Sequence, residues 1–132
     1  MSKYVFPAIF TKEDDGLFSI NFPDFQACFT QGSDLADGLK MAKDVLELTL
    51  CDMEDEHEKI PKPSDPICME IEKNSFISLI SADTMEYRKN YSGKAVKKTL
   101  TIPEWLNTAA ERQNINFSAV LQQALIERLN LK

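Results

Sequence analysis

The chain has 132 residues, of which 43% are hydrophobic and 27% charged, and its formal net charge is −6. This composition is typical of a soluble globular protein with one domain or two small ones. No apolar run is long enough to span a membrane, and the N-terminus lacks the apolar core of a signal peptide, so we expect a cytoplasmic protein.

The first part of the chain predicts three short strands. Residues 3–11 predict a strand in which Pro7 indicates an edge position or a local irregularity. A polar turn that ends at Gly16 joins this strand to a second one at 17–22, and the two are expected to form a hairpin. A third strand is expected at 25–30.

A long helix is predicted next, at about residues 34–57, with Ser33 or Asp34 as its N-cap. Its apolar residues form a broad stripe that suits packing across a sheet. Gly38 lies inside this helix, where glycine costs about 1 kcal/mol relative to alanine. Close packing of another element at this position would explain the glycine.

The middle of the chain predicts a proline-rich connector over residues 61–66 and further strands at 67–71 and 76–81. Asp83 or Thr84 is expected to cap a short helix that follows. The first part is therefore an α+β domain, in which one long helix covers one face of a small antiparallel sheet.

A hinge at Ser92 and Gly93 divides the sequence into predicted domains 1–92 and 93–132. After it, residues 96–102 alternate as in a strand that stops at Pro103, which suits the first turn of a helix. A helix is predicted at 104–113, and Asn116 is expected to cap a second one.

This C-terminal segment is too small to bury its own core, and its single strand would be an unpaired edge. Pairing of two copies about a two-fold axis would pair the strands antiparallel and pack four helices over one apolar face. The residues expected at this dimer interface are Val96, Leu100, Ile102, Leu106, Val120, Leu121 and Leu125.

The pattern resembles the ribbon-helix-helix repressors of the Arc and MetJ type, which insert paired strands into the DNA major groove. The resemblance implies that Lys97, Thr99 and Thr101 face the bases, and that Asn116, Phe117 and Ser118 offer backbone N–H groups to a phosphate. Residues 93–132 carry a net charge of +3 against −9 for the rest. The alternative is an ordinary strand-helix-helix piece of a single core, with the polar face merely solvated.

Three widely spaced cysteines, Cys28, Cys51 and Cys68, form no metal-binding or redox motif and are expected to be buried, reduced thiols. His57 is the single histidine and lies in an acidic run, which indicates an exposed helix end rather than a catalytic or metal-binding role.

The N-terminal part resembles the HicB antitoxin family. The resemblance lies in residues 16–25, which end in Phe-Pro-Asp, in Thr30-Gln31-Gly32 before the helix, and in the proline-rich exit at 60–63. Two positions depart from the family pattern: Ala27-Cys28 replaces a frequent glycine, and Asp37-Gly38 replaces a usual Glu-Ala pair. With the ribbon-helix-helix segment, the resemblance spans nearly the whole chain.

The resemblance implies a trimmed ribonuclease H-like fold and the antitoxin role of a toxin–antitoxin system. Its partner would be a HicA-type toxin, a small basic protein that cleaves mRNA, and the antitoxin would cover the toxin's RNA-binding face. Phe22, Phe25 and Phe29 could anchor that contact, although a core role is favoured for each. The C-terminal domain would bind operator DNA as a homodimer or a higher even oligomer and would repress its own operon. No membrane partner is expected.

Ribonuclease H-like enzymes hold metal ions with several carboxylates. Here Asp14, Asp15, Asp24 and Asp34 fall in turns and at a helix cap, where acidic residues are common. We therefore expect no catalytic residues, no metal and no cofactor, and thus no enzyme. A metal-dependent nuclease and a stand-alone repressor that senses a small ligand through its acidic domain are the alternatives.

Overall fold

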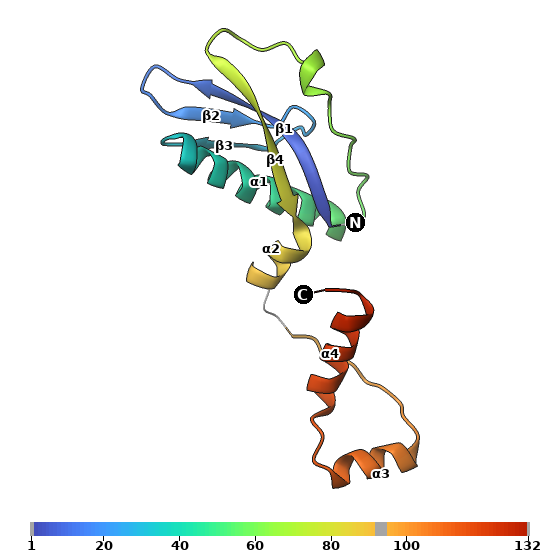
Figure 1. Cartoon of the computed structure of the whole chain (residues 1–132). Helices are drawn as coiled ribbons and strands as arrows, with labels where there is room; N and C mark the ends of the chain where they lie inside the picture. Colours follow the sequence, from blue (N-terminus) through green and yellow to red (C-terminus); the bar gives the residue numbers. More distant parts are fainter. Residues whose placement is uncertain (1, 92–94, 132) are drawn as a thin grey trace. The chain divides into compact units, whose positions relative to one another are not determined.

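The computed structural model describes residues 2–91 and 95–131, and the chain divides into two compact units, residues 1–94 and 95–132. We call them the N-terminal unit and the C-terminal unit. The described residues of the two units form one four-stranded antiparallel sheet and four α-helices, which confirms the predicted α+β class (Figure 1). None of the helices in the described residues is long and apolar enough to cross a membrane.

The N-terminal sheet has the strand order β3-β2-β1-β4. Strands β1 (Lys3–Lys12) and β2 (Phe18–Asn21) form the predicted hairpin, in register from Ile9 opposite Asn21 to Lys12 opposite Phe18. The turn between them contains Gly16 at φ +86°, a left-handed conformation that glycine adopts at little cost.

Strand β4 (Ser75–Asp83) lies along the other side of β1, so the predicted strand at 76–81 is confirmed and longer than expected. Pro7 therefore lies in an interior strand, opposite Leu79. The ladder with β2 includes only residues 9–12 of β1, so the side of Pro7 that faces away from β4 has no strand to bond. The sequence predicted an edge position for Pro7, and this holds only for the part of β1 before residue 9, which pairs with β4 but not with β2.

Helix α1 (Leu35–Asp55) covers one face of the sheet, as predicted (Figure 1). Asp34 caps it, because its carboxylate accepts a hydrogen bond from the Asp37 amide at 2.8 Å. The largest fully buried side chains come from both layers and form one continuous core. They include Phe6, Phe10, Ile20, Phe22, Leu46 and Leu50.

Two glycines allow α1 to approach the sheet closely. A Cβ atom added to Gly32, at the end of β3 (Phe29–Gly32), would lie 2.5 Å from the Cα atom of Gly38 in α1. A Cβ atom on Gly38 would lie 3.0 Å from the ring of Phe10. The close packing suspected at Gly38 is therefore present, and a methyl group there would require the Phe10 ring to shift.

One predicted strand is shorter than expected and one is absent. The third strand is present but begins at Phe29 rather than residue 25, because the Phe25 amide bonds the Phe22 carbonyl in a turn and its ring packs on Phe6. Residues 67–71 form no strand. Instead, Pro66–Cys68 form a 3₁₀ turn capped by Asp65.

Helix α2 (Thr84–Tyr91) follows β4 directly, and its first amides bond the Asp83 carboxylate, as predicted. An ion pair fastens it to the end of α1: Arg88 lies 3.1 Å from Glu54 and 3.0 Å from Asp55. Glu54 also accepts hydrogen bonds from the Tyr4 hydroxyl at 2.8 Å and from the Thr84 hydroxyl at 3.0 Å. This cluster therefore joins the first strand, the long helix and α2.

The C-terminal unit contains α3 (Glu104–Arg112) and α4 (Phe117–Arg128), close to the predicted ranges. Asn116 caps α4 by accepting a hydrogen bond from the Ala119 amide at 3.1 Å. Residues 95–103 precede the helices and form no strand, in contrast to the prediction for 96–102. A strand is defined by its hydrogen-bonded partner, and the described part of this unit holds no second extended segment.

The substitution Gly32→Ala tests the contact between α1 and β3. The new methyl group meets backbone rather than a flexible side chain, so we expect the free energy of unfolding to fall by about 3 kcal/mol. Urea unfolding monitored by circular dichroism measures this loss. Gly16→Ala is the matched control, because its Cβ would have no neighbour within 4 Å. Its left-handed backbone should cost only about 1 kcal/mol; equal losses would contradict the close approach.

The substitution Tyr4→Phe tests the cluster at Glu54. Burial, with the hydrogen bond to Glu54 and its charge, raises the pKa of Tyr4 to about 12. Because the folded pKa exceeds the ordinary value of 10.0, this stability is complete below pH 10 and is lost as the pH rises towards 12. We expect Tyr4→Phe to lower stability at pH 8 by about 1 kcal/mol and to flatten the alkaline loss. Urea unfolding at several pH values checks this, with Tyr91→Phe at an exposed tyrosine as the control.

Candidate interaction surfaces

The acidic side chains and the cysteines are the residues for which the sequence raised a chemical role. The described residues contain no group of three or more His, Cys, Asp and Glu side chains that could hold a metal ion. Cys28 and Cys51 are buried, and burial raises the pKa of both thiols, which disfavours the reactive thiolate. Cys68 is exposed, so the prediction of burial is wrong for it, because it lies in the 3₁₀ turn rather than in a strand.

The four aspartates that the sequence singled out lie in the predicted turns and cap. Asp15 accepts a hydrogen bond from the Leu17 amide in the β1–β2 turn, and Asp34 caps α1. The Asp24 carboxylate bonds both the amide and the hydroxyl of Ser64. Asp24 therefore fastens the Phe-Pro-Asp turn to the proline-rich connector, which gives a structural reason for these two motifs to occur together. His57 is exposed just after α1, as expected.

One candidate surface is a groove of about 510 Å³ on the sheet face opposite α1, which we call the outer groove. Its apolar residues are Ile9, Ile20, Phe29 and Ile71, and three acidic side chains line it as well. The acidic residues are Glu13, Glu70 and Glu72, and the polar remainder includes Thr11, Ser19, Asn21 and Ser75. The groove thus combines apolar contact area with negative charge.

The three phenylalanines considered as partner anchors differ in exposure. Phe22 is fully buried, and Phe25 is partly buried against the core. Phe29 is 67% exposed and lines the outer groove. The structure explains this difference: Gly32 packs against α1, so strand alternation turns Phe29 to the opposite face. Phe29 is therefore the one of the three that a partner can reach.

A second candidate surface is an open groove of about 640 Å³ in the C-terminal unit, which we call the C-terminal groove. It brings together five of the seven residues predicted for the dimer interface. These are Leu100, Ile102, Leu106, Val120 and Leu121; Val96 and Leu125 are exposed and do not line it. None of the described residues of this unit is buried, so the unit does not cover this apolar surface by itself.

The residues predicted to face the DNA bases lie outside the C-terminal groove. Lys97, Thr99 and Thr101 are exposed and do not line it, whereas the alternate residues Lys98, Leu100 and Ile102 do. The alternation of this segment therefore divides a polar side from an apolar side.

At the start of α4, Asn116 is the N-cap, and Phe117 and Ser118 line the C-terminal groove. Phe117 therefore places its side chain among the apolar residues. Only its backbone N–H group remains available for the predicted phosphate contact.

Comparison with known families places nearly the whole chain within one of them. Residues 6–129 match the family described as the HicB_like antitoxin of bacterial toxin–antitoxin systems. A relative in Haemophilus phage HP1, described as an uncharacterized 14.9 kDa protein in the rep-hol intergenic region, is 28% identical over 102 residues. That match covers 77% of this chain and 75% of the phage protein.

Two solved structures are similar over the full length of their own chains. A chain of a toxin–antitoxin complex from Streptococcus pneumoniae has 31% sequence identity and a TM-score of 0.62, covering 96% of this chain and 99% of that one. A chain of a HicA3 and HicB3 toxin–antitoxin complex has 23% identity and a TM-score of 0.51, covering 61% of this chain and 99% of that one. At this lower identity the second likeness shows the fold alone.

Proposed function

The chain belongs to the HicB_like antitoxin family of bacterial toxin–antitoxin systems, and from this we propose that it neutralises a HicA-type toxin and represses its own operon. The N-terminal unit would bind the toxin through the outer groove. The C-terminal unit would pair with a second copy and bind operator DNA. The observation that supports toxin binding is the exposed side chain of Phe29, which lines the outer groove together with three glutamates.

Three features support toxin binding at the outer groove. A related chain with 31% identity occurs in a toxin–antitoxin complex. A toxin that cleaves RNA must present basic groups to phosphates, and residues 1–92 of this chain carry a net charge of −9. Opposite net charges accelerate encounter, while affinity depends on a few buried apolar contacts. Phe29 supplies such a contact, and Glu13, Glu70 and Glu72 line the same groove.

In this arrangement the antitoxin acts by steric exclusion. The glutamates would occupy the positions that RNA phosphates take on the toxin, and Phe29 would enter a neighbouring apolar pocket. The antitoxin needs no reactive group for this, which fits the buried thiols and the structural roles of Asp15, Asp24 and Asp34.

The C-terminal unit supports the second role because its apolar side chains lack cover. Two copies related by a two-fold axis would pair residues 96–102 antiparallel and close the C-terminal groove of each copy against the other. Lys97, Thr99 and Thr101 would then project from the paired strands into the major groove. The first amides of α4 would bind a flanking phosphate, since a helix N-terminus attracts anions.

The substitution Phe29→Ala tests the toxin contact. Phe29 is 67% exposed, so its truncation should leave the fold intact while removing an apolar anchor. We expect binding of the purified cognate toxin to weaken about 30-fold, roughly 2 kcal/mol. Isothermal titration calorimetry measures this change, and growth after co-expression reports neutralisation. Leu35→Ala is the control, since Leu35 is 55% exposed but belongs to α1 on the other side of the sheet. Unchanged affinity in Phe29→Ala would refute the outer groove as the binding site.

The double substitution Lys97→Ala with Thr99→Ala tests DNA recognition. It should abolish operator binding in a gel-shift titration and leave toxin neutralisation intact, because the two functions belong to separate units. Loss of a lysine that neutralises a phosphate also reduces the slope of the logarithm of the binding constant against the logarithm of the salt concentration by about one. The single variant Lys98→Ala removes an equal charge from the other side of the segment and should retain operator binding. Wild-type operator affinity in the double variant would contradict the predicted contact face.

A further inference from the structure

Strand β4 forms one edge of the N-terminal sheet, because the strand order is β3-β2-β1-β4. It spans Ser75–Asp83 and pairs along its whole length with β1. Among the described residues no strand pairs with its other side. A long, unpaired edge is a ready template for another strand, and proteins usually protect such edges with charges, prolines or a covering segment.

The hydrogen bonds at the two ends of the β1–β4 ladder show which backbone groups of β4 face outward. The Thr84 amide donates to the Ser2 carbonyl at 2.9 Å, and the Lys12 amide donates to the Asn74 carbonyl at 3.1 Å. Hydrogen-bonded and non-bonded pairs alternate along an antiparallel ladder. The even-numbered residues of β4 therefore bond β1, and the odd-numbered ones point their N–H and C=O groups away from the sheet.

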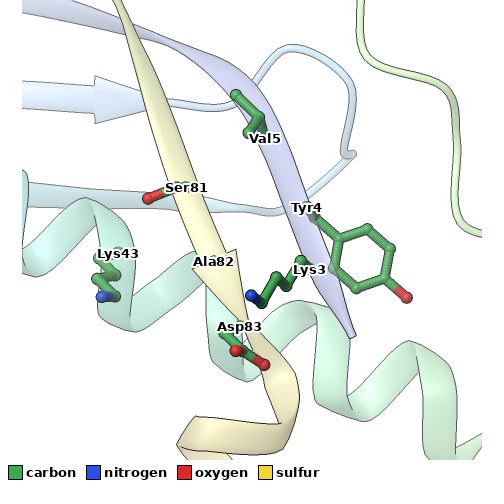
Figure 2. Close-up of a pocket in the computed structure, with 7 residues that line it drawn as sticks. All are labelled: Lys3, Tyr4, Val5, Lys43, Ser81, Ala82 and Asp83. Carbon is green, nitrogen blue, oxygen red and sulfur yellow. The ribbon is translucent and has the colours of Figure 1, made fainter. Parts of the chain in front are cut away.

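The chain protects only one end of this edge. The outward amide of Asp83 donates to the carboxylate of Glu47 at 3.0 Å. Next to it, Lys43 of α1 and Ser81 lie on the side of β4 away from β1, around a hollow of about 380 Å³ (Figure 2). The stretch that remains for pairing is residues 75–81.

This stretch is complementary to itself. Its sequence, Ser-Phe-Ile-Ser-Leu-Ile-Ser, has the same order of side-chain types in both directions about Ser78. It contains no charged residue and no proline, the two features that commonly keep an edge single. On its outer face Leu79 is 58% exposed.

We propose that β4 pairs with β4 of a second copy of this chain, antiparallel about a two-fold axis at Ser78. Ser75 of one copy then faces Ser81 of the other, and Ile77 faces Leu79. Every outward-facing residue opposes an outward-facing residue, so their amides and carbonyls bond one another. The two sheets become one continuous sheet, with both α1 helices on the same face.

The charged residues at the two ends of the paired strands also favour a second copy of this chain as the partner. Two positions before Ser75 and two after Ser81, the pairing places Lys73 of one copy opposite Asp83 of the other, twice by symmetry. Opposite charges in facing positions stabilise a strand pair, and like charges oppose it. This contact depends on neither toxin binding nor DNA binding.

The substitution Leu79→Pro tests the pairing in the full chain. Leu79 faces Pro7 in a non-bonded pair, so proline removes an outward donor and no hydrogen bond to β1. Amide hydrogen exchange of the outward N–H groups of Ile77 and Ser81 should be slow in the wild type and fast in the variant, whether or not the C-terminal units also pair. Val5→Lys is the control: Val5 is 47% exposed on the adjacent strand, and its substitution should keep the slow exchange of these two amides. If circular dichroism shows that Leu79→Pro is unfolded, Leu79→Lys makes the same comparison. Fast exchange of these amides in the wild type, or slow exchange in the folded variant, overturns the proposal.

Disulfide trapping tests the register. In a Cys68→Ser background, Ser78→Cys places two cysteines on the two-fold axis, where non-bonded antiparallel pairs hold Cα atoms about 4.5 Å apart, within disulfide reach. Mild oxidation should cross-link this variant into a covalent dimer. Ser81→Cys should not cross-link, because it faces Ser75, whereas mixing Ser81→Cys with Ser75→Cys should give a heterodimer. Cross-linking of Ser81→Cys with itself, or none at Ser78→Cys, overturns the proposed axis.

Discussion

The C-terminal unit does not bury its own apolar side chains, and this is the constraint on which the proposed regulatory role depends. An extended segment and two helices place Leu100, Ile102 and Val120 around an open groove, and none of the described residues there is buried. Each such side chain gains about 1.5–3 kcal/mol when it leaves water. The proposed pairing of two copies would cover both grooves at once and would give residues 96–102 a partner strand.

The N-terminal unit presents the opposite case, because its core is complete within one chain. Helix α1 reaches the sheet through the contact of Gly32 with Gly38, and Asp24 holds the connector against the Phe-Pro-Asp turn. Motif residues that suggested a family by their spacing thus have structural roles. What this unit leaves exposed is an outer groove with acidic residues and an unpaired edge at β4, and both are suited to binding other chains.

The local sequence pattern was sufficient to predict most helices and strands, but it was insufficient to predict which strands pair. Caps such as Asp34 and Asn116 fixed helix starts because their hydrogen bonds reach only three residues ahead. The apolar run at 67–71 looked like a strand, but a 3₁₀ turn capped by Asp65 occupies its start, and no β-ladder partner for it could be read from local sequence. The strand predicted at 96–102 is proposed to need a second molecule. The exposure of Phe29 depends on the position of Gly32 relative to α1. Errors therefore occurred where structure depends on contacts distant in sequence.

Amide hydrogen exchange of residues 96–102, measured above and below the concentration at which the chain dissociates, tests most directly whether this unit is completed by a second copy. Pairing about a two-fold axis predicts slow exchange at alternate residues of this segment at high concentration. On dilution, that protection should disappear together with the protection of α3 and α4. Fast exchange throughout 96–102 at every concentration, with both helices still protected, would contradict it.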